Sequence, residues 1–229
     1  MNPSIRSSTF FGDADQTLLP PRPMATNSVV DMCILELLTS RLCYEMSGPI
    51  AAVNNGIELL AEEEDDFRSD ALALVGESAR RASRQLQFYR FAYGFSRGRA
   101  MAGATPPELA ARFFDATRLA CDYGESVRLL PLDSQKLACN MLLVGAEALS
   151  RGGSLTLTDG PPGLDLQIVG ETVFLSPEVC AALALATPVA ALTSRTVQAY
   201  FTGLLAEALE RRLVRRNNAV RTSRGRSSE

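Results

Sequence analysis

The chain has 229 residues, of which 46% are hydrophobic and 21% are charged, a composition typical of one or two globular domains with a true core. It contains no histidine. The missing histidine excludes Ser-His-Asp and Cys-His catalysis, histidine metal ligands and phosphohistidine. The formal net charge of −3 argues against a protein that binds nucleic acid over its whole surface.

The two ends of the chain lack the patterns of folded elements. Residues 1–28 contain four of the 12 prolines and many small polar residues, so we expect a disordered leader there and a disordered tail at 223–229. No apolar run is long enough for a signal peptide or a membrane-spanning helix. The five cysteines are scattered and never form a C-x-x-C motif, which predicts a cytoplasmic protein with reduced cysteines.

Two amphipathic helices are predicted between residues 29 and 95. The acidic run at 62–66 separates them as a solvated turn, and Gly94 is a suitable end for the second helix. A short turn between long helices predicts an antiparallel hairpin. Because two helices bury little apolar surface, we expect this hairpin to form a homodimeric four-helix bundle. The apolar stripes are Ile34, Leu38, Leu42, Met46, Ile50, Val53, Ile57 and Leu60 in the first helix, and Leu72, Val75, Ala79, Ala82, Leu86, Tyr89 and Tyr93 in the second.

Residues 104–222 are predicted to form a second domain of mixed structure. The fold class is therefore α+β: the dimerising helical hairpin is followed by a small α/β sandwich whose helices cover a mostly antiparallel sheet. The helices are expected at 107–121, at 135–149 with Asp133 or Ser134 as its cap, at 176–186 and at 194–209; the strands are expected at 127–132, 154–158 and 164–169 and in a final hairpin over 213–222.

The run from Arg41 to Leu60, RLCYEMSGPIAAVNNGIELL, resembles the phosphotransfer helix of ChpT-type histidine phosphotransferases. That family has an acceptor histidine, then Asp or Glu, then proline, then Asn-Asn-Gly-hydrophobic-Glu-Leu-Leu. Segments 78–94, 146–153 and 197–205 match in the same order, so the resemblance covers about residues 29–222. It implies a dimeric hairpin like that of sensor histidine kinases, a degenerate kinase ATP domain, and a receiver domain of a response regulator as partner in a two-component phosphorelay.

The sequence departs from this family at the acceptor itself. Tyr44 stands at the position of the acceptor histidine, and Glu45 is the acidic neighbour that assists proton handling in the family. Phenols carry little phenolate at neutral pH, so we expect these two catalytic positions to be inactive. The resemblance gives a structural role to the other motif residues, and Pro49 is expected to kink the helix just after the acceptor turn. These structural positions are Pro49, Asn54, Asn55 and Gly56.

A receiver domain must reach Tyr44 from solvent. At about 100° per residue, Tyr44 lies almost opposite the apolar stripe of its own helix, among small side chains. Arginines on the second helix could attract an acidic receiver, or could simply form a solvated face. The expected partner-binding surface consists of Ser40, Arg41, Tyr44, Ser47, Gly48, Ala51, Arg80 and Arg84.

The motifs for nucleotide binding are missing. Val144 stands where related kinases carry the asparagine that holds Mg²⁺, and residues 169–174, VGETVF, replace the Asp-x-Gly-x-Gly segment. We therefore expect no ATP, no metal and no other cofactor. The arginines near the C-terminus lack interleaved aromatic residues, so nucleic acid is not an expected partner.

The sequence favours a phosphorelay protein of the histidine phosphotransferase family that lacks the acceptor and binds receiver domains. Two alternatives remain open at this level. One is an active phosphotransferase that uses Tyr44, Glu45 or a cysteine in place of histidine. The other is a helical dimer that serves as a scaffold for an unrelated partner.

Overall fold

The computed structural model describes residues 31–62, 68–94, 103–115, 117–160, 163–216 and 219–224. Asp31–Glu229 form one compact unit. The expected leader, residues 63–66 of the acidic run and residues 95–102 between the two predicted domains lie outside the described residues. In chain order the elements are α1 (Met32–Glu62), α2 (Arg68–Tyr93), α3 (Pro106–Asp115), β1 (Leu119–Tyr123), α4 (Glu125–Arg128), α5 (Leu132–Glu147), β2 (Gly153–Gly160), β3 (Gly163–Val169), α6 (Pro177–Leu183), α7 (Val197–Ala208), β4 (Arg211–Arg216) and β5 (Ala219–Arg224).

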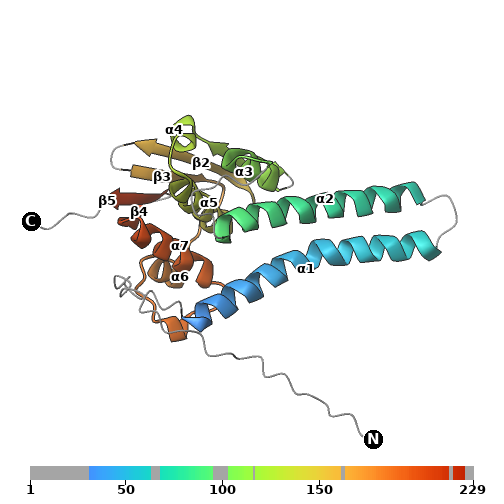
Figure 1. Ribbon diagram of the computed structural model, residues 1–229, viewed down its shortest axis with the longest axis horizontal. Helices are drawn as coiled ribbons and strands as arrows, with labels where there is room; N and C mark the ends of the chain where they lie inside the picture. Colours follow the sequence, from blue (N-terminus) through green and yellow to red (C-terminus); the bar gives the residue numbers. More distant parts are fainter. Residues whose placement is uncertain are drawn as a thin grey trace, which may run out of the picture. The chain divides into compact units, whose positions relative to one another are not determined.

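α1 and α2 form the antiparallel hairpin that the sequence predicts (Figure 1). The helices approach closely at Gly56, where an added Cβ atom would lie 2.5 Å from Val75 Cγ2 and 3.6 Å from the Ala71 carbonyl oxygen. α1 changes direction part of the way along its length (Figure 1), and it contains Pro49, which cannot donate a hydrogen bond to the preceding turn. No described helix is both long enough and apolar enough to cross a membrane.

The five strands form one sheet in the order β1-β2-β3-β5-β4. β1 pairs with β2 in parallel and the other pairs are antiparallel, so the predicted α+β class with a mostly antiparallel sheet is confirmed. α5 lies against this sheet: a Cβ atom added to Gly145 would be 2.8 Å from Leu166 Cδ2 and 2.9 Å from Leu155 Cδ2. Both leucines are fully buried, and most of α5 is buried with them.

Between residues 107 and 132, one predicted helix is too long and one predicted strand is wrong. The expected helix over 107–121 ends at Asp115, because Thr117 closes the chain there by donating from its hydroxyl to the Phe114 carbonyl oxygen at 2.7 Å. Residues 119–123 then form β1, which pairs with β2 from Leu119↔Gly153 to Tyr123↔Leu157. The expected strand over 127–132 is instead the short helix α4 and a loop. A short apolar run does not distinguish helix from strand until its pairing partner is known.

Of the two predicted N-caps in the second domain, the one before α5 is wrong and the one before α6 is confirmed. α5 begins at Leu132 with Pro131 as its N-cap residue, so the expected cap at Asp133 or Ser134 is wrong. α6 begins as predicted, because the Ser176 hydroxyl accepts a hydrogen bond from the Val179 amide at 3.3 Å and Pro177 follows it. The last two strands form the expected hairpin, and β5 continues to Arg224, two residues into the expected tail.

Candidate functional site

Tyr44 projects from the outer surface of α1, and its side chain is 80% exposed. The small residues around it, Ser40, Ser47, Gly48 and Ala51, are also exposed. We call these five residues the Tyr44 patch. A Cβ atom added to Gly48 would meet no atom within 4 Å, and the Ser47 hydroxyl donates back to the Tyr44 carbonyl oxygen at 2.7 Å. Among the described residues, no hydrogen bond reaches the Tyr44 hydroxyl; the bond from Ser47 goes to the Tyr44 carbonyl oxygen.

Arg41 lies one turn before Tyr44, but it is not an open docking residue. Its guanidinium donates to the Glu147 carboxylate at 2.6 Å and to the Ser194 carbonyl oxygen at 3.3 Å, and its side chain is only 16% exposed. Burial alone would lower the pKa of Arg41, but the carboxylates of Glu147 and Glu45 raise it above its ordinary value. Arg41 therefore joins the turn that carries Tyr44 to α5 and to the segment before α7.

Glu45 is the acidic neighbour of the acceptor position, and it faces Arg41 at 3.8 Å. This contact is made by carboxylate oxygen and guanidinium nitrogen across one helical turn. Glu147 completes the group: burial raises its pKa, and the nearby Arg41 guanidinium offsets part of that rise. Glu45 thus belongs to an ion-pair cluster with Arg41 and Glu147.

Two tyrosines of α2, Tyr89 and Tyr93, lie close enough to this cluster for its charges to act on their pKa values. The rings of Tyr89 and Tyr93 stack with centroids 5.6 Å apart at an interplanar angle of 14°. Burial raises the pKa of Tyr93 to about 12, with the guanidinium of Arg41 acting in the opposite direction. Burial also raises the pKa of Tyr89. Both phenols are therefore neutral at physiological pH, and the Tyr93 hydroxyl donates to Gln198 Oε1 at 2.5 Å.

The two arginines expected on the partner-binding surface lie on α2 and contact other residues. Arg80 forms an exposed pair with Glu77 on its own helix at 3.2 Å. Arg84 contacts Asp115, the last residue of α3, at 3.4 Å. Neither contact brings these arginines to the Tyr44 patch, which is carried by α1.

The four motif residues with an expected structural role divide into two pairs. Pro49 and Gly56 are buried, and Gly56 lies in the contact with α2 described above. Asn54 and Asn55 are exposed. Burial is therefore consistent with a structural role for Pro49 and Gly56, but not for Asn54 and Asn55.

Val144, which stands at the position of the metal-binding asparagine of related kinases, lies on α5. Val144 is 1% exposed within the hydrophobic core. Asn140, one turn earlier on α5, donates to the carbonyl oxygens of Ala92 and Lys136 and accepts from Gln198, so its amide is fully used. The described residues also contain no group of three Cys, Asp or Glu side chains that could hold a metal ion.

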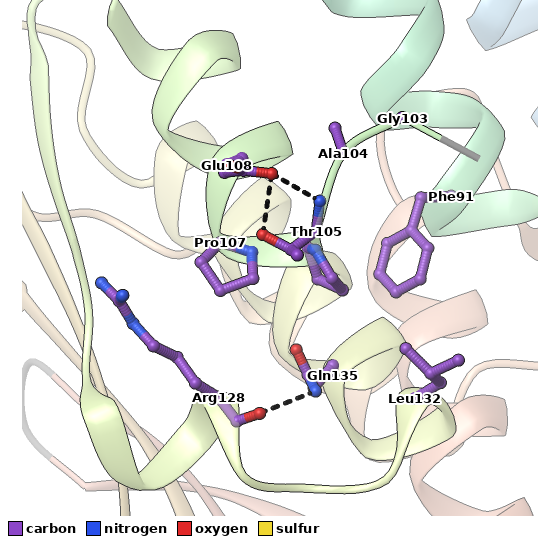
Figure 2. Close-up of a pocket in the computed structure, with 10 residues that line it drawn as sticks. Phe91, Gly103, Ala104, Thr105, Pro107, Glu108, Arg128, Leu132 and Gln135 are labelled. Atoms are coloured by element: carbon purple, nitrogen blue, oxygen red, sulfur yellow. Dashed lines mark hydrogen bonds between the residues drawn. The ribbon is translucent and has the colours of Figure 1, made fainter. Parts of the chain in front are cut away.

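A cavity of about 670 Å³ lies apart from the Tyr44 patch, between α2, α3, α4 and α5 (Figure 2). Phe91 and Leu132 give it apolar walls, and Arg128 lines it from α4. At the start of α3 the Thr105 amide donates to Glu108 Oε2 at 2.7 Å, which is one half of a capping box, and the Thr105 hydroxyl donates to the same oxygen at 3.0 Å. These bonds lower the pKa of Glu108.

Sequence reasoning did not identify Tyr93, Glu147, Ser194 or Gln198 as neighbours of the acceptor turn. Glu147 and Gln198 lie inside the segments 146–153 and 197–205 that carry the family resemblance. Their place in these segments is the one sequence feature that marks them as important. A motif does not predict which residues of a distant segment its members contact.

The comparisons with known proteins agree with this architecture. The family model for the histidine phosphotransferase C-terminal domain matches residues 104–219. The protein phosphotransferase ChpT of Brucella abortus (strain 2308) is 36% identical over 177 residues, covering 75% of this chain and 84% of that protein. A solved 1.7 Å structure of a bacterial phosphotransferase superposes with a TM-score of 0.68 at 31% identity, covering 84% of this chain and 96% of the other. The chain therefore belongs to the ChpT-type histidine phosphotransferase family.

Proposed function

We propose that this protein binds receiver domains of response regulators in a two-component phosphorelay but does not carry phosphate at the acceptor position. The observation that carries the proposal is the Tyr44 patch: an exposed phenol, surrounded by small side chains, stands at the family's acceptor position. A receiver that donates phosphate must bring its aspartyl phosphate within bonding distance of the acceptor, which requires such an open surface. The docking surface is kept and the nucleophile is lost.

Loss of phosphotransfer follows from the chemistry of the residues present. A phenol needs a base or strong activation to attack a phosphoryl group, and Glu45, the nearest acidic side chain in sequence, is paired with Arg41. The proposal also excludes ATP, because Val144 is buried and the Asn140 amide is already hydrogen-bonded within the protein. The protein is then a pseudoenzyme that receives its signal through partners. Its five cysteines, all free, suit the reducing cytoplasm where we place it.

Homodimerisation is part of the proposal and is supported by apolar side chains left on one side of the hairpin. α1 and α2 touch at Gly56 and Ala71. Ile57 is the residue after Gly56, and Leu72 is the residue after Ala71. A step of about 100° in antiparallel helices places both side chains on the same side of the hairpin. Each belongs to an exposed stripe with a seven-residue spacing. The stripes are Ile50 and Ile57 on α1, and Leu72, Ala79 and Leu86 on α2.

The decisive experiment uses a purified, phosphorylated receiver domain with the natural chain, Tyr44→His and Tyr44→Phe. We expect all three to bind the receiver with similar affinity in isothermal titration calorimetry, because the patch around the side chain is unchanged. Only Tyr44→His should gain acid-labile phosphate. The Phe variant is the matched control, since it keeps the ring and removes the hydroxyl.

Two outcomes would contradict the proposal. Acid-stable phosphate on the natural chain that is lost in Tyr44→Phe would establish the alternative of an active phosphotransferase. No binding to any receiver domain of the source organism, together with stable association with an unrelated protein, would favour the alternative of a helical scaffold.

A further inference from the structure

The C-terminal end of α2 is attached to the rest of the chain by polar groups at three consecutive residues. The Ala92 carbonyl oxygen accepts from Asn140 Nδ2 at 2.8 Å. The Tyr93 hydroxyl donates to Gln198 Oε1 at 2.5 Å. The Gly94 carbonyl oxygen accepts from Lys136 Nζ at 2.5 Å. These bonds reach α5 and α7, two helices that follow the hairpin only after α3, β1 and α4 in the sequence.

The polar groups that receive α2 are deeply buried and fully used. Asn140, Gln198 and Thr202 are each 0% exposed. Gln198 Nε2 donates to Asn140 Oδ1 at 3.1 Å and lies 3.3 Å from Thr202 Oγ1, whose hydroxyl donates to the Gln198 carbonyl oxygen at 2.7 Å. Among the described residues, none of these side-chain atoms is left without a partner. We call Tyr93, Asn140 and Gln198 the α2 lock; Thr202 lies at its edge and does not contact α2 through a hydrogen bond among the described residues.

Such an arrangement restricts movement more than apolar packing does. Two apolar surfaces can slide by a small distance at little cost, whereas a buried hydrogen-bonded network has one favourable geometry. Moving α2 away from α7 would leave Gln198 Oε1 buried without a partner and would remove the partner of the Tyr93 hydroxyl, and both changes are unfavourable. The lock therefore favours a single placement of the hairpin against α5 and α7.

The lock is connected to the Tyr44 patch through Arg41. Tyr93 stacks on Tyr89, and the positive charge of Arg41 acts on Tyr93, where it opposes the rise in the pKa of the phenol that burial causes. Arg41 in turn binds Glu147 and the Ser194 carbonyl oxygen, one turn from Tyr44. The hairpin is thus held at the end of α2 and at the acceptor turn of α1, and both attachments lie on the α+β part of the chain.

We propose that Gln198 and Asn140 are positioning residues for receiver binding: they fix the hairpin against α5 and α7, so that the Tyr44 patch and the residues beside Arg41 form one preorganised docking surface. This inference rests on the proposed function, because it assigns the buried network a role in recognition. Preorganisation strengthens binding, since a partner then does not have to order the surface that it contacts.

The test removes the lock while keeping the shapes of its side chains. Tyr93→Phe combined with Gln198→Met replaces both members of the central hydrogen bond by apolar groups of similar size. Because Gln198 Nε2 also donates to Asn140 Oδ1, we expect the double variant to melt at a lower temperature than the natural chain. Thr202→Val is the matched control, because it alters the edge of the network and leaves the bonds from Tyr93 and Asn140 in place. The full-length chain is used throughout, and its melting temperature is measured for each variant.

Two readouts separate positioning from a purely structural role. The first is the distance distribution between spin labels at Asp70→Cys on α2 and Thr158→Cys on β2, two exposed sites. The exposed Cys43 is replaced by Ser so that it takes no label, and the labelled chain is diluted with unlabelled protein so that distances within one chain dominate. The second is the affinity for the purified receiver domain. We expect the double variant to broaden the distribution and to weaken receiver binding about tenfold, equivalent to about 1.4 kcal/mol, while Thr202→Val changes neither.

A distribution that stays narrow in the double variant would overturn the lock. A broad distribution with unchanged receiver affinity would overturn the positioning role. A double variant that fails to fold is replaced by Tyr93→Phe alone, for which the same two results decide. If the natural chain binds no receiver, the proposed function and the positioning role both fail, but the distance distribution still decides whether the lock holds the hairpin.

Discussion

The Arg41 guanidinium and the Glu147 carboxylate are 106 residues apart in sequence and meet at 2.6 Å. This contact joins the helix that carries Tyr44 to the end of α5. It accounts for the low exposure of an arginine that helical periodicity places beside the docking patch. Breaking it is the most direct way to measure how strongly the hairpin depends on the α+β part.

Glu147→Gln should lower the free energy of unfolding by about 1–3 kcal/mol, because a charge-assisted hydrogen bond to a mostly buried arginine is weakened. Urea denaturation followed by circular dichroism measures this loss. Glu171→Gln is the matched control, since its pair with Arg151 spans 3.6 Å between exposed side chains and should contribute less than about 0.5 kcal/mol. Equal losses in the two variants would show that the Arg41–Glu147 pair contributes no more to the free energy of unfolding than an exposed ion pair does.

Gly56→Val should separate the two helices of the hairpin. Its Cβ atom would lie 2.5 Å from Val75 Cγ2, so we expect a loss of about 1–3 kcal/mol in the free energy of unfolding. Combining it with Val75→Ala should restore part of the loss, and a double-mutant cycle measures that coupling. Gly76→Ala is the control: only the mobile end of Arg80 is near it, so better helix propensity should stabilise the chain by up to about 1 kcal/mol.

Ile57→Glu should convert the proposed dimer into a monomer, because it places a charge in the centre of the exposed apolar stripe. Sedimentation velocity at micromolar concentration measures the change. The control is Leu59→Glu, which adds the same charge to the same helix. Leu59 is exposed too but lies on the opposite side of the hairpin, about 60° from Gly56 in the other direction. A natural chain that sediments as a monomer would contradict the four-helix bundle.

Ala51→Trp should weaken receiver binding at least about tenfold, because a large ring would fill the open patch beside Tyr44. The side chain at this position is exposed, so the melting temperature should change little. Calorimetric titration with a receiver domain measures the affinity. Ala73→Trp on the exposed surface of α2 is the control, and an equal loss there would show that the receiver does not dock on the Tyr44 patch.

Stability should fall steeply as the pH rises above about 10. Burial raises the pKa of Tyr93 and of Cys121 to about 12 in the folded chain, so their neutral forms are favoured by folding. This contribution is complete below the unfolded pKa values, near 8.5 for Cys and 10 for Tyr, and is lost as the pH approaches 12. Each such group adds a slope of up to about 1.4 kcal/mol per pH unit. Denaturation at several pH values measures the slope, and a flat profile between pH 9 and 11 would contradict it.

The matched variant for this titration is Tyr93→Phe. It lacks one ionisable phenol, so its stability should fall less steeply between pH 10 and 12 than that of the natural chain. Its stability at pH 7 should also be lower, because Gln198 Oε1 loses its donor. An unchanged slope would mean that Tyr93 ionises equally readily in the folded and unfolded chains.

The local signals in the sequence predicted much of the fold. Apolar residues at steps of three and four defined both helices of the hairpin, and Ser176-Pro177 defined the start of α6. The same reasoning failed at β1 and α4. β1 exists because residues 119–123 pair with residues 153–157, and no local pattern encodes a parallel pairing partner that far along the chain.

The sequence by itself determined the family frame, the position of Tyr44 within it and the absence of any histidine that could accept phosphate. Only the tertiary structure decided that Arg41 is bound to Glu147, that Arg84 contacts α3, and that Asn140 and Gln198 hold the end of α2. The physical reason is the range of the interactions. Helical periodicity and missing residue types are properties of neighbouring positions, whereas ion pairs and buried hydrogen bonds depend on which distant segments the packed core brings together.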